Sequence, residues 1–305
     1  MRISIKLLIA QVFVFFALVN FSYAQRPESK LGWQLGAQAW TFRQSTFAET
    51  LDTLKSIEVD YLQGFNGQKL GGGIDGNMDF HMDAATREKV LELLKQKGIK
   101  MVSFGVVSAN SDDDWRQLFE FIKGMGLKQF ATEPDPKFIP LVAKLADEYE
   151  INVAIHDHPR PTRYWSPDTV LKYIGASKRL GACADIGHWV RSGLDPVQCL
   201  KKLEGHIFEL HFKDLDRKPS EEMLKTLAAI PAGGQWPKEV FELLEKGPHD
   251  VHWGNGVSNI SGVMKELKRQ GFKGPIFAEY EYNWGKNAAD VAASAKYFRS
   301  VAKKL

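Results

Sequence analysis

The sequence has few cysteines and little excess charge. The first argues against a disulfide-stabilised fold, and the second argues against binding to nucleic acid or to an acidic membrane. Only two of its 305 residues are cysteine, Cys183 and Cys199. A chain of this length buries enough apolar surface to fold without disulfide staples, so Cys183 is expected to be a buried free thiol, although one disulfide stays open. The formal net charge of +3 provides no basic surface for nucleic acid or for an acidic membrane. No GxGxxG motif follows the first expected strand, which argues against a dinucleotide-binding sheet.

Residues 1–24 have the layout of a secretory signal peptide. A basic head with Arg2 and Lys6 precedes the apolar run LLIAQVFVFFALV and the small-residue site that ends at Ala24. This run is shorter than the roughly 20 residues that span a bilayer, so cleavage after Ala24 is favoured over a membrane anchor. No cysteine stands directly after the run, which argues against a lipoprotein. We therefore expect a secreted or periplasmic mature protein of residues 25–305, with no stable membrane anchor.

Short apolar runs alternate with amphipathic stretches eight times along the mature chain. The expected strands are residues 33–40, 61–65, 100–107, 129–132, 152–156, 180–184, 207–212 and 275–280. The stretches between them carry apolar residues at three- and four-residue spacing, which predicts helices, and several end in glycine, as at Gly98 and Gly271. Eight strand–helix units in one domain predict an α/β fold, a (β/α)8 TIM barrel.

Two long segments interrupt this alternation. Residues 66–82 form a glycine-rich stretch, and residues 214–256 contain two expected helices at 221–230 and 238–247. Both follow strand ends, on the face where barrels of this kind build their sites. Long loops there are typically lids or walls of a site. The alternative is an elaboration without function.

Five consecutive expected strands end in carboxylate or imidazole side chains. These residues are Glu133; His156 and His158; Asp185, with His188 beyond it; His211, followed by Lys213; and Glu279 with Glu281. Strand ends of a barrel converge on its axis, so these like charges would repel each other without a cation. Mixed carboxylate oxygens and imidazole nitrogens suit Mn²⁺, Mg²⁺, Co²⁺ or Zn²⁺. We expect one divalent metal ion here, against the alternative of a metal-free polar network.

The segment CADIGHW at 183–189 contains the most informative of these strand ends. Gly187 is expected to turn the chain so that His188 and Trp189 lean over a pocket. The sequence has eight tryptophans, several beside turn residues, as in clefts that stack on sugar rings. We expect Trp40 and Trp189, with His156 and Glu281, to contact a carbohydrate substrate.

The segments CADIGHW, ELHFKD, FAEYE and VAIHDHP resemble those of the xylose isomerase-like TIM-barrel superfamily, the sugar phosphate isomerase/epimerase group. The resemblance covers essentially the whole mature chain. It implies that Asp185, His211 and Glu279 bind a divalent metal, with Mn²⁺ first among the candidates, and that His188 touches the substrate.

The fifth strand departs from the family pattern. Where the family often has Leu-Glu-Asn-His, this sequence has His156-Asp157-His158. The fourth metal ligand could therefore be Glu133, which restores a carboxylate, or His156. Losing the carboxylate of the fifth strand also argues against a plain ketose epimerase.

The chemistry implied is enolisation, the removal of a proton next to a carbonyl group. Glu279, His158 and Lys213 are candidate bases, although Lys213 could equally form a salt bridge with Asp214 or a strand-end carboxylate. The first hypothesis is an isomerase or epimerase of a non-phosphorylated sugar, because sugar phosphates are cytoplasmic. The second is a hydrolase or lyase that cleaves 3-keto-glycosides, and the third is a non-catalytic carbohydrate-binding barrel. The oligomeric state stays open.

Overall fold

The computed structural model describes residues 26–233 and 238–305. The expected signal peptide at residues 1–24 lies outside this part of the chain. Among the described residues, no helix combines the length and apolarity needed to cross a membrane.

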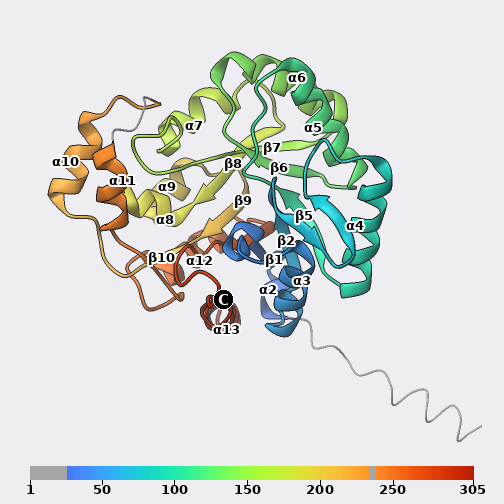
Figure 1. The fold of residues 1–305 in the computed structure, drawn as a ribbon. Helices are drawn as coiled ribbons and strands as arrows, with labels where there is room; N and C mark the ends of the chain where they lie inside the picture. Colours follow the sequence, from blue (N-terminus) through green and yellow to red (C-terminus); the bar gives the residue numbers. More distant parts are fainter. Residues whose placement is uncertain (1–25, 234–237) are drawn as a thin grey trace, which may run out of the picture.

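Eight parallel strands in the described residues wrap into a nearly closed barrel (Figure 1), as the alternation predicted. They are β1 (Trp33–Gln38), β2 (Tyr61–Gly64), β5 (Lys100–Phe104), β6 (Gln129–Thr132), β7 (Asn152–His156), β8 (Leu180–Asp185), β9 (Ile207–Phe212) and β12 (Gly274–Ala278). Their order is β5-β2-β1-β12-β9-β8-β7-β6. The two ends of the sheet meet where Val107 N–H donates to the Ala131 carbonyl over 3.1 Å. The prediction of a single-domain (β/α)8 TIM barrel is therefore confirmed.

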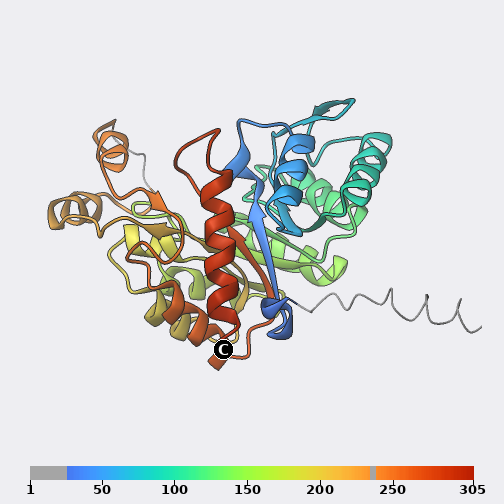
Figure 2. The same cartoon turned by 90° about the horizontal axis from the view of Figure 1, so that it is seen from below.

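Helices surround this barrel. They are α2 (Pro27–Lys30), α3 (Phe47–Ser56), α4 (Ala84–Lys97), α5 (Asp112–Gly124), α6 (Ile139–Tyr149), α7 (Pro167–Ile174), α8 (Ile186–Arg191), α9 (Pro196–Lys202), α10 (Glu221–Ala229), α11 (Lys238–Glu245), α12 (Ile260–Arg269) and α13 (Ala288–Ala302), with short 3-10 helices at Ala39–Phe42 and Pro136–Phe138. Figure 2 shows α13 beside β1, where the rings of Trp33 and Phe298 lie 5.7 Å apart. As expected, Gly98 ends α4 in the left-handed conformation, with φ of 69°.

The two long segments have more structure than the sequence predicted. Residues 66–82 contain an antiparallel hairpin of β3 (Lys69–Gly71) and β4 (Ile74–Asn77). In the excursion 214–256, the strands β10 (Asp214–Leu215) and β11 (Asp250–Val251) pair at its base. Beyond that base lie the two expected helices, α10 and α11, which project from the barrel in Figure 1.

The tip of the excursion has a hydrophobic cluster of its own. Met223, Leu227 and Val240 are buried there, and this cluster is separate from the main core of the barrel. The two helices of the excursion therefore have a core of their own, while its paired base and a hydrogen bond from Gly233 N–H to the Pro161 carbonyl tie the excursion to the barrel.

Gly187 does not turn the chain, contrary to expectation. It lies inside α8, which begins directly after β8 because the Asp185 side chain accepts the backbone N–H of His188 and caps the helix. A Cβ atom at position 187 would instead collide with the Cβ of Lys213. Glycine is required here because Lys213, the residue directly after β9, approaches the helix closely. Both cysteines are free and buried, as expected for Cys183.

We predict that Gly187→Ala lowers the free energy of unfolding by about 1–3 kcal/mol, the usual cost of overpacking. The matched control is Gly175→Ala at the end of α7. Gly175 has a helical φ of −67° and open space where a methyl group would extend, so its change should stay within about 0.5 kcal/mol. Urea unfolding of the two variants checks this. Equal stability of both variants would contradict the close-approach explanation.

Candidate metal centre

The barrel brings the predicted polar residues together at the carboxyl ends of its strands. Glu133 follows β6 and His156 ends β7, while Glu279 follows β12. Asp185 ends β8 and lies opposite His211 of β9 in the strand register. The expected convergence of carboxylates and imidazoles is therefore present. The side chains differ in whether they lie at the centre of this group or behind it.

The ammonium group of Lys213 lies at the centre of this convergence. Its Nζ is 2.9 Å from Asp185 Oδ2, 2.7 Å from Glu279 Oε2 and 3.1 Å from Glu281 Oε2. Burial alone would lower the pKa of Lys213, but these three carboxylates raise it well above its usual range. Of the two roles foreseen for Lys213, the geometry supports the salt bridge with strand-end carboxylates.

A second cation, Arg191 of α8, extends this network to the base of the excursion. Its guanidinium lies 2.8 Å from Asp250 Oδ1 and 3.2 Å from Glu281 Oε2. Asp250 also accepts the backbone N–H of Glu281 over 2.6 Å. Together with Asp185 and Glu279, this ion-pair network of described residues sets four carboxylates against two cations. Buried negative charge in such excess is unfavourable unless another cation shares it.

Glu133 holds His156 in one orientation. Its Oε1 lies 2.9 Å from His156 Nδ1 and also bonds His158 Nδ1. The other nitrogen, His156 Nε2, faces Asp185 Oδ2 at 3.7 Å and has no hydrogen-bond partner among the described residues. Of the two rivals for the fourth ligand position, His156 therefore faces Asp185, and Glu133 lies behind it.

The negative charges around His156 favour the protonated, positively charged form of its ring. Burial alone would lower the pKa of His156, but the nearby carboxylates of Asp185 and Glu133, the second of which accepts a hydrogen bond from the ring, raise it to about 10. Burial would likewise raise the pKa of Glu133, but His158 and His156 lower it to about 2. Glu133 is thus a carboxylate that keeps the His156 ring in place.

Two buried residues that the sequence analysis missed orient His211 in the same way. Gln63 Nε2 donates to Glu209 Oε1 over 2.6 Å, which turns Gln63 Oε1 toward His211 Nε2, 2.7 Å away. An amide oxygen only accepts, so His211 Nε2 must carry the proton. His211 Nδ1 is then left with a lone pair. It lies 2.7 Å from Glu279 Oε2, but the two atoms are not aligned for a hydrogen bond, and Nδ1 has no such partner among the described residues.

One of these two residues had a signal in the sequence. Glu209, His211 and Lys213 alternate along IFELHFK and therefore share one face of the strand. Gln63 has no comparable signal, because a single glutamine in a short strand is uninformative until its neighbours in space are known.

His188 lies beside the same carboxylate. Its ring Nε2 is 3.5 Å from Asp185 Oδ2 and 3.1 Å from Lys213 Nζ. Burial lowers the pKa of His188 well below its usual range, and the charge of Lys213 adds to this against the charge of Asp185. The ring is therefore neutral, and the ring of His158 stacks on it at 5.0 Å.

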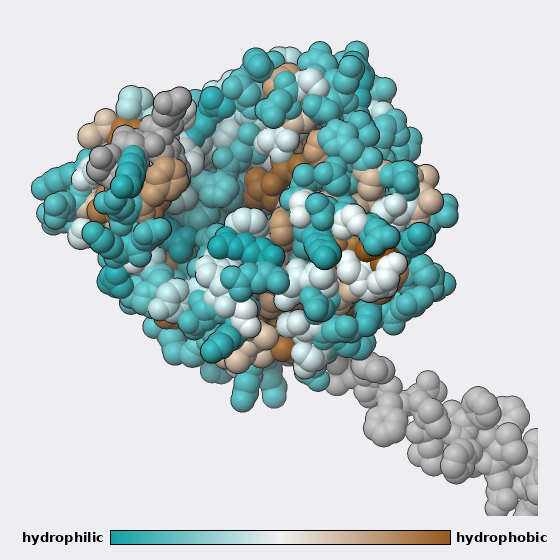
Figure 3. Space-filling model, in the orientation of Figure 1, coloured by the Kyte–Doolittle hydropathy of each residue, from teal (hydrophilic) through white to brown (hydrophobic). Residues whose placement is uncertain are grey.

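A cavity of about 260 Å³ opens above these residues, between hydrophobic and polar walls. It is lined by Gln38, Trp40, Phe65, Asn66, Val106, His158, Glu279 and Glu281. The Trp40 indole N–H donates to Glu281 Oε1 over 3.2 Å, and the Trp40 and Phe65 rings meet edge to face at 5.3 Å. The space-filling view in Figure 3 shows hydrophobic atoms in the hollow near the centre of this face, with hydrophilic atoms around it.

Trp189 does not reach this cavity. It is 1 % exposed and belongs to the main hydrophobic core, so the expectation that it stacks on a sugar is wrong. The helix α8 explains the error, because it turns position 189 inward where a loop would have presented it to solvent.

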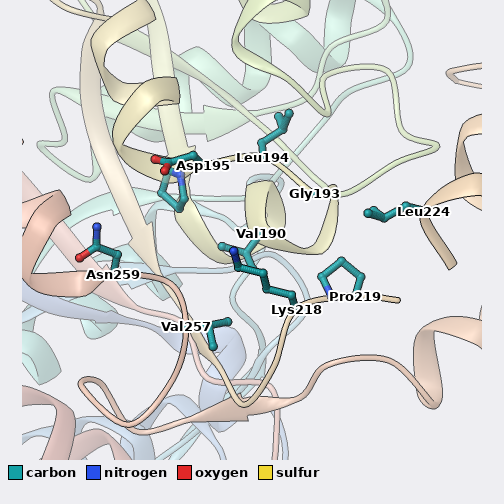
Figure 4. A pocket seen from close by; sticks show the side chains of 10 residues that line it. Val190, Gly193, Leu194, Asp195, Lys218, Pro219, Leu224, Val257 and Asn259 are labelled. Atoms are coloured by element: carbon teal, nitrogen blue, oxygen red, sulfur yellow. The ribbon is translucent and has the colours of Figure 1, made fainter. Parts of the chain in front are cut away.

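A second cavity of about 230 Å³ lies between α8, α9 and the excursion. Figure 4 shows Leu194 and Val190 on one side of it and Leu224 and Pro219 on the other. None of the residues that line this second cavity belongs to the ion-pair network of Lys213 and Arg191. The charged side chains therefore adjoin the first cavity, at the barrel mouth, and not the second.

The described residues fit a divalent cation. His156, Asp185, His188 and Glu279 each place a nitrogen or oxygen atom within 4.8 Å of the others. His156 Nε2 and His211 Nδ1 have no hydrogen-bond partner among the described residues, and the surrounding network has surplus negative charge. Imidazole and carboxylate together are typical ligands of Mn²⁺, Co²⁺ and Zn²⁺.

Comparisons with known proteins agree with this fold. The family described as "Xylose isomerase-like TIM barrel" matches residues 138–301. An uncharacterized protein from Parabacteroides distasonis ATCC 8503 is similar in structure, with 29% identity, a TM-score of 0.66, and coverage of 88% of this chain and 99% of the other. A search of curated protein sequences gave no match.

Two more distant structures share the fold. A sugar phosphate isomerase/epimerase from the same organism has 13% identity and a TM-score of 0.62 and covers 92% of this chain and 96% of its own. D-psicose 3-epimerase from Clostridium cellulolyticum H10 has 9% identity and a TM-score of 0.62, with coverage of 88% and 99%.

We predict that Gln63→Leu weakens Mn²⁺ binding by about 10- to 100-fold, as loss of an orienting partner of a ligand typically does. The reason is that His211 would lose the acceptor that holds its proton on Nε2. Metal titration measures the affinity, and ¹⁵N NMR of the imidazoles measures the tautomer. Ser103→Ala is the control, since Ser103 contacts Gln63 Nε2 at 3.2 Å without touching His211. An unchanged tautomer and affinity in Gln63→Leu would contradict the assigned role.

Proposed function

Because the chain belongs to the xylose isomerase-like TIM-barrel family, we propose that it is a metal-dependent enzyme that enolises a non-phosphorylated sugar, as isomerases and epimerases do. One observation carries the proposal. Imidazole nitrogens without hydrogen-bond partners and surplus carboxylates meet beside a cavity of about 260 Å³, and two of these carboxylates, Glu279 and Glu281, line it. Weaker support comes from the names of similar structures, a sugar phosphate isomerase/epimerase and D-psicose 3-epimerase.

Asp185, Glu279, His156 and His211 are the side chains that would hold the metal ion, with Mn²⁺ as the first candidate. Bound there, the ion would supply Lewis acidity toward the carbonyl and hydroxyl oxygens of the sugar. Glu133 and Gln63 would hold the rings of His156 and His211 so that Nε2 of the first and Nδ1 of the second face the ion. Lys213 offsets part of the carboxylate charge, so the ligand oxygens stay close together.

His158 and Glu279 are the proposed proton-transfer groups. Both line the cavity, from β7 and β12, which are separated in the sheet by β8 and β9. They therefore approach the cavity from different sides. Glu133 bonds His158 Nδ1, which leaves Nε2 to exchange a proton with the carbon next to the carbonyl. Removal by one group and return by the other would invert that carbon.

The charges of the site support a substrate without a phosphate group. No arginine or lysine lines the cavity among the described residues. Lys213 is buried among three carboxylates and Arg191 is held by two, so neither cation is free to bind a phosphate.

A second candidate function is cleavage of a 3-keto-glycoside. The observation in its favour is the pair of Glu133 and His158, where the His158 side chain is 44 % exposed. A histidine held in this way could protonate the oxygen of a departing aglycone after the neighbouring proton has been removed.

The deciding experiment incubates the Mn²⁺-loaded protein in D₂O with free ketoses and aldoses, and separately with 3-keto-glycosides. We expect deuterium at the carbon next to the carbonyl in recovered sugar, because enolisation exchanges that proton with solvent. Release of aglycone would instead support the second function. Sugar binding without exchange or cleavage would indicate a non-catalytic carbohydrate-binding barrel and would contradict both.

Asp185→Asn should lose both bound metal and deuterium exchange, with at least a 100-fold lower rate. Asp195→Asn is the matched control, because Asp185 and Asp195 each cap a helix through a side-chain oxygen and only Asp185 belongs to the centre. Metal retained at full occupancy in Asp185→Asn would show that the ligand set is wrong.

We also propose that the protein acts outside the cytoplasm after loss of residues 1–24. N-terminal sequencing of the exported protein should then begin at Gln25. A chain that retains its first residues would overturn this proposal without affecting the proposed chemistry.

A further inference from the structure

Cys183 lies one strand pleat below Asp185, facing the interior of the barrel. The strand register pairs it with His156 of β7, and both side chains are fully buried. It lies two residues before the end of β8, below the carboxylates of the barrel mouth, and the strand register places it beside Glu209 of β9.

His156, Cys183 and His211 form a compact cluster of their own. One nitrogen or sulfur atom of each lies within 4.8 Å of those of the other two. The rings of His156 and His211 are 4.9 Å apart, and all three side chains are 0 % exposed. A thiol and two imidazoles are thus held together inside the barrel without access to bulk water.

Independent evidence for a ligand comes from unsatisfied hydrogen-bonding atoms. His156 Nε2 and His211 Nδ1 have no partner among the described residues. The opposite nitrogens are engaged by Glu133 and Gln63. A buried nitrogen without a hydrogen-bond partner is costly, and a bound cation would satisfy both at once.

We propose that Cys183, His156 and His211 form a second metal position, deeper than the carboxylate centre, that takes thiophilic divalent cations such as Cd²⁺ and Zn²⁺. The donor set is one sulfur and two imidazole nitrogens. Soft sulfur ligands select such cations over Mn²⁺ and Mg²⁺, which prefer oxygen. This position differs from the centre of the proposed function in its metal preference and in one kind of ligand, because the thiol of Cys183 takes the place of the carboxylates of Asp185 and Glu279.

The two positions share His156 and His211, so only one of them can be filled at a time. The one unpartnered nitrogen of His156, Nε2, can bind a single ion at a time. A thiophilic cation in the deeper position therefore removes His156 from the carboxylate centre. The deeper position is thus a site at which Cd²⁺ or Zn²⁺ competes with Mn²⁺ for the same protein.

The test titrates the metal-free full-length mature protein with Cd²⁺ and follows the thiolate-to-metal charge-transfer absorption in the ultraviolet. We expect a band that saturates at one ion per chain in the wild type. Cys183→Ser and Cys183→Ala should lose it, and circular dichroism of both variants shows whether the fold is kept. Cys199→Ser is the matched control, because Cys199 is the other buried free cysteine and is no member of the cluster, so its band should persist.

Failure of this inference can be told apart from failure of the proposed function. Asp185→Asn should retain the Cd²⁺ band, since Asp185 is no ligand of the deeper position, while it loses Mn²⁺. Absence of the band in the wild type, or a band that survives in both Cys183 variants, would overturn the second metal position. Neither result bears on deuterium exchange by the Mn²⁺-loaded protein.

Discussion

The balance of buried charge at the barrel mouth is the constraint on which the rest of the site depends. Four carboxylates and two cations are packed there within ion-pair distance, and such groups tolerate burial only when each charge has partners. Lys213 draws Asp185 and Glu279 together, and its close approach to α8 excludes any side chain at Gly187. Arg191 ties the excursion to the same network through Asp250. The local conformations of α8 and of the excursion base thus follow from how these charges are shared.

Hydrogen-bond acceptors behind the imidazoles fix the orientation of the histidine rings in the site. Glu133 and Gln63 each occupy one nitrogen of a histidine, and the opposite nitrogen is then turned toward Asp185 or Glu279. The ligand-type atoms are therefore set before any ion arrives, at the cost of two nitrogens that have no hydrogen-bond partner among the described residues. Pre-orientation of this kind is how second partners of metal ligands raise affinity. It also explains why polar residues fill the interior of this barrel, where branched apolar side chains are usual.

Much of the fold and part of the site could be predicted from the sequence, for a physical reason. Buried parallel strands are recognisable as short apolar runs, and the ends of these strands converge in a barrel. Asp185, His211 and Glu279 could therefore be placed together without coordinates. What failed depended on packing between distant segments. The helix α8 is too short to show a periodic apolar pattern, so Trp189 was expected to lean over the pocket from a turn. Gln63 matters only because Glu209 lies across the barrel from it, and the order of Glu133 behind His156 is a matter of side-chain geometry.

The separate hydrophobic cluster at the tip of the excursion has a consequence for how the protein can vary. Met223, Leu227 and Val240 stabilise α10 and α11 without contributing to the main core. Substitutions in the tip would therefore change its own stability while the barrel keeps its full cooperativity, since units with separate cores open independently. The wall of the cavity in Figure 4 that carries Leu224 thus belongs to a unit whose hydrophobic core is separate from that of the barrel.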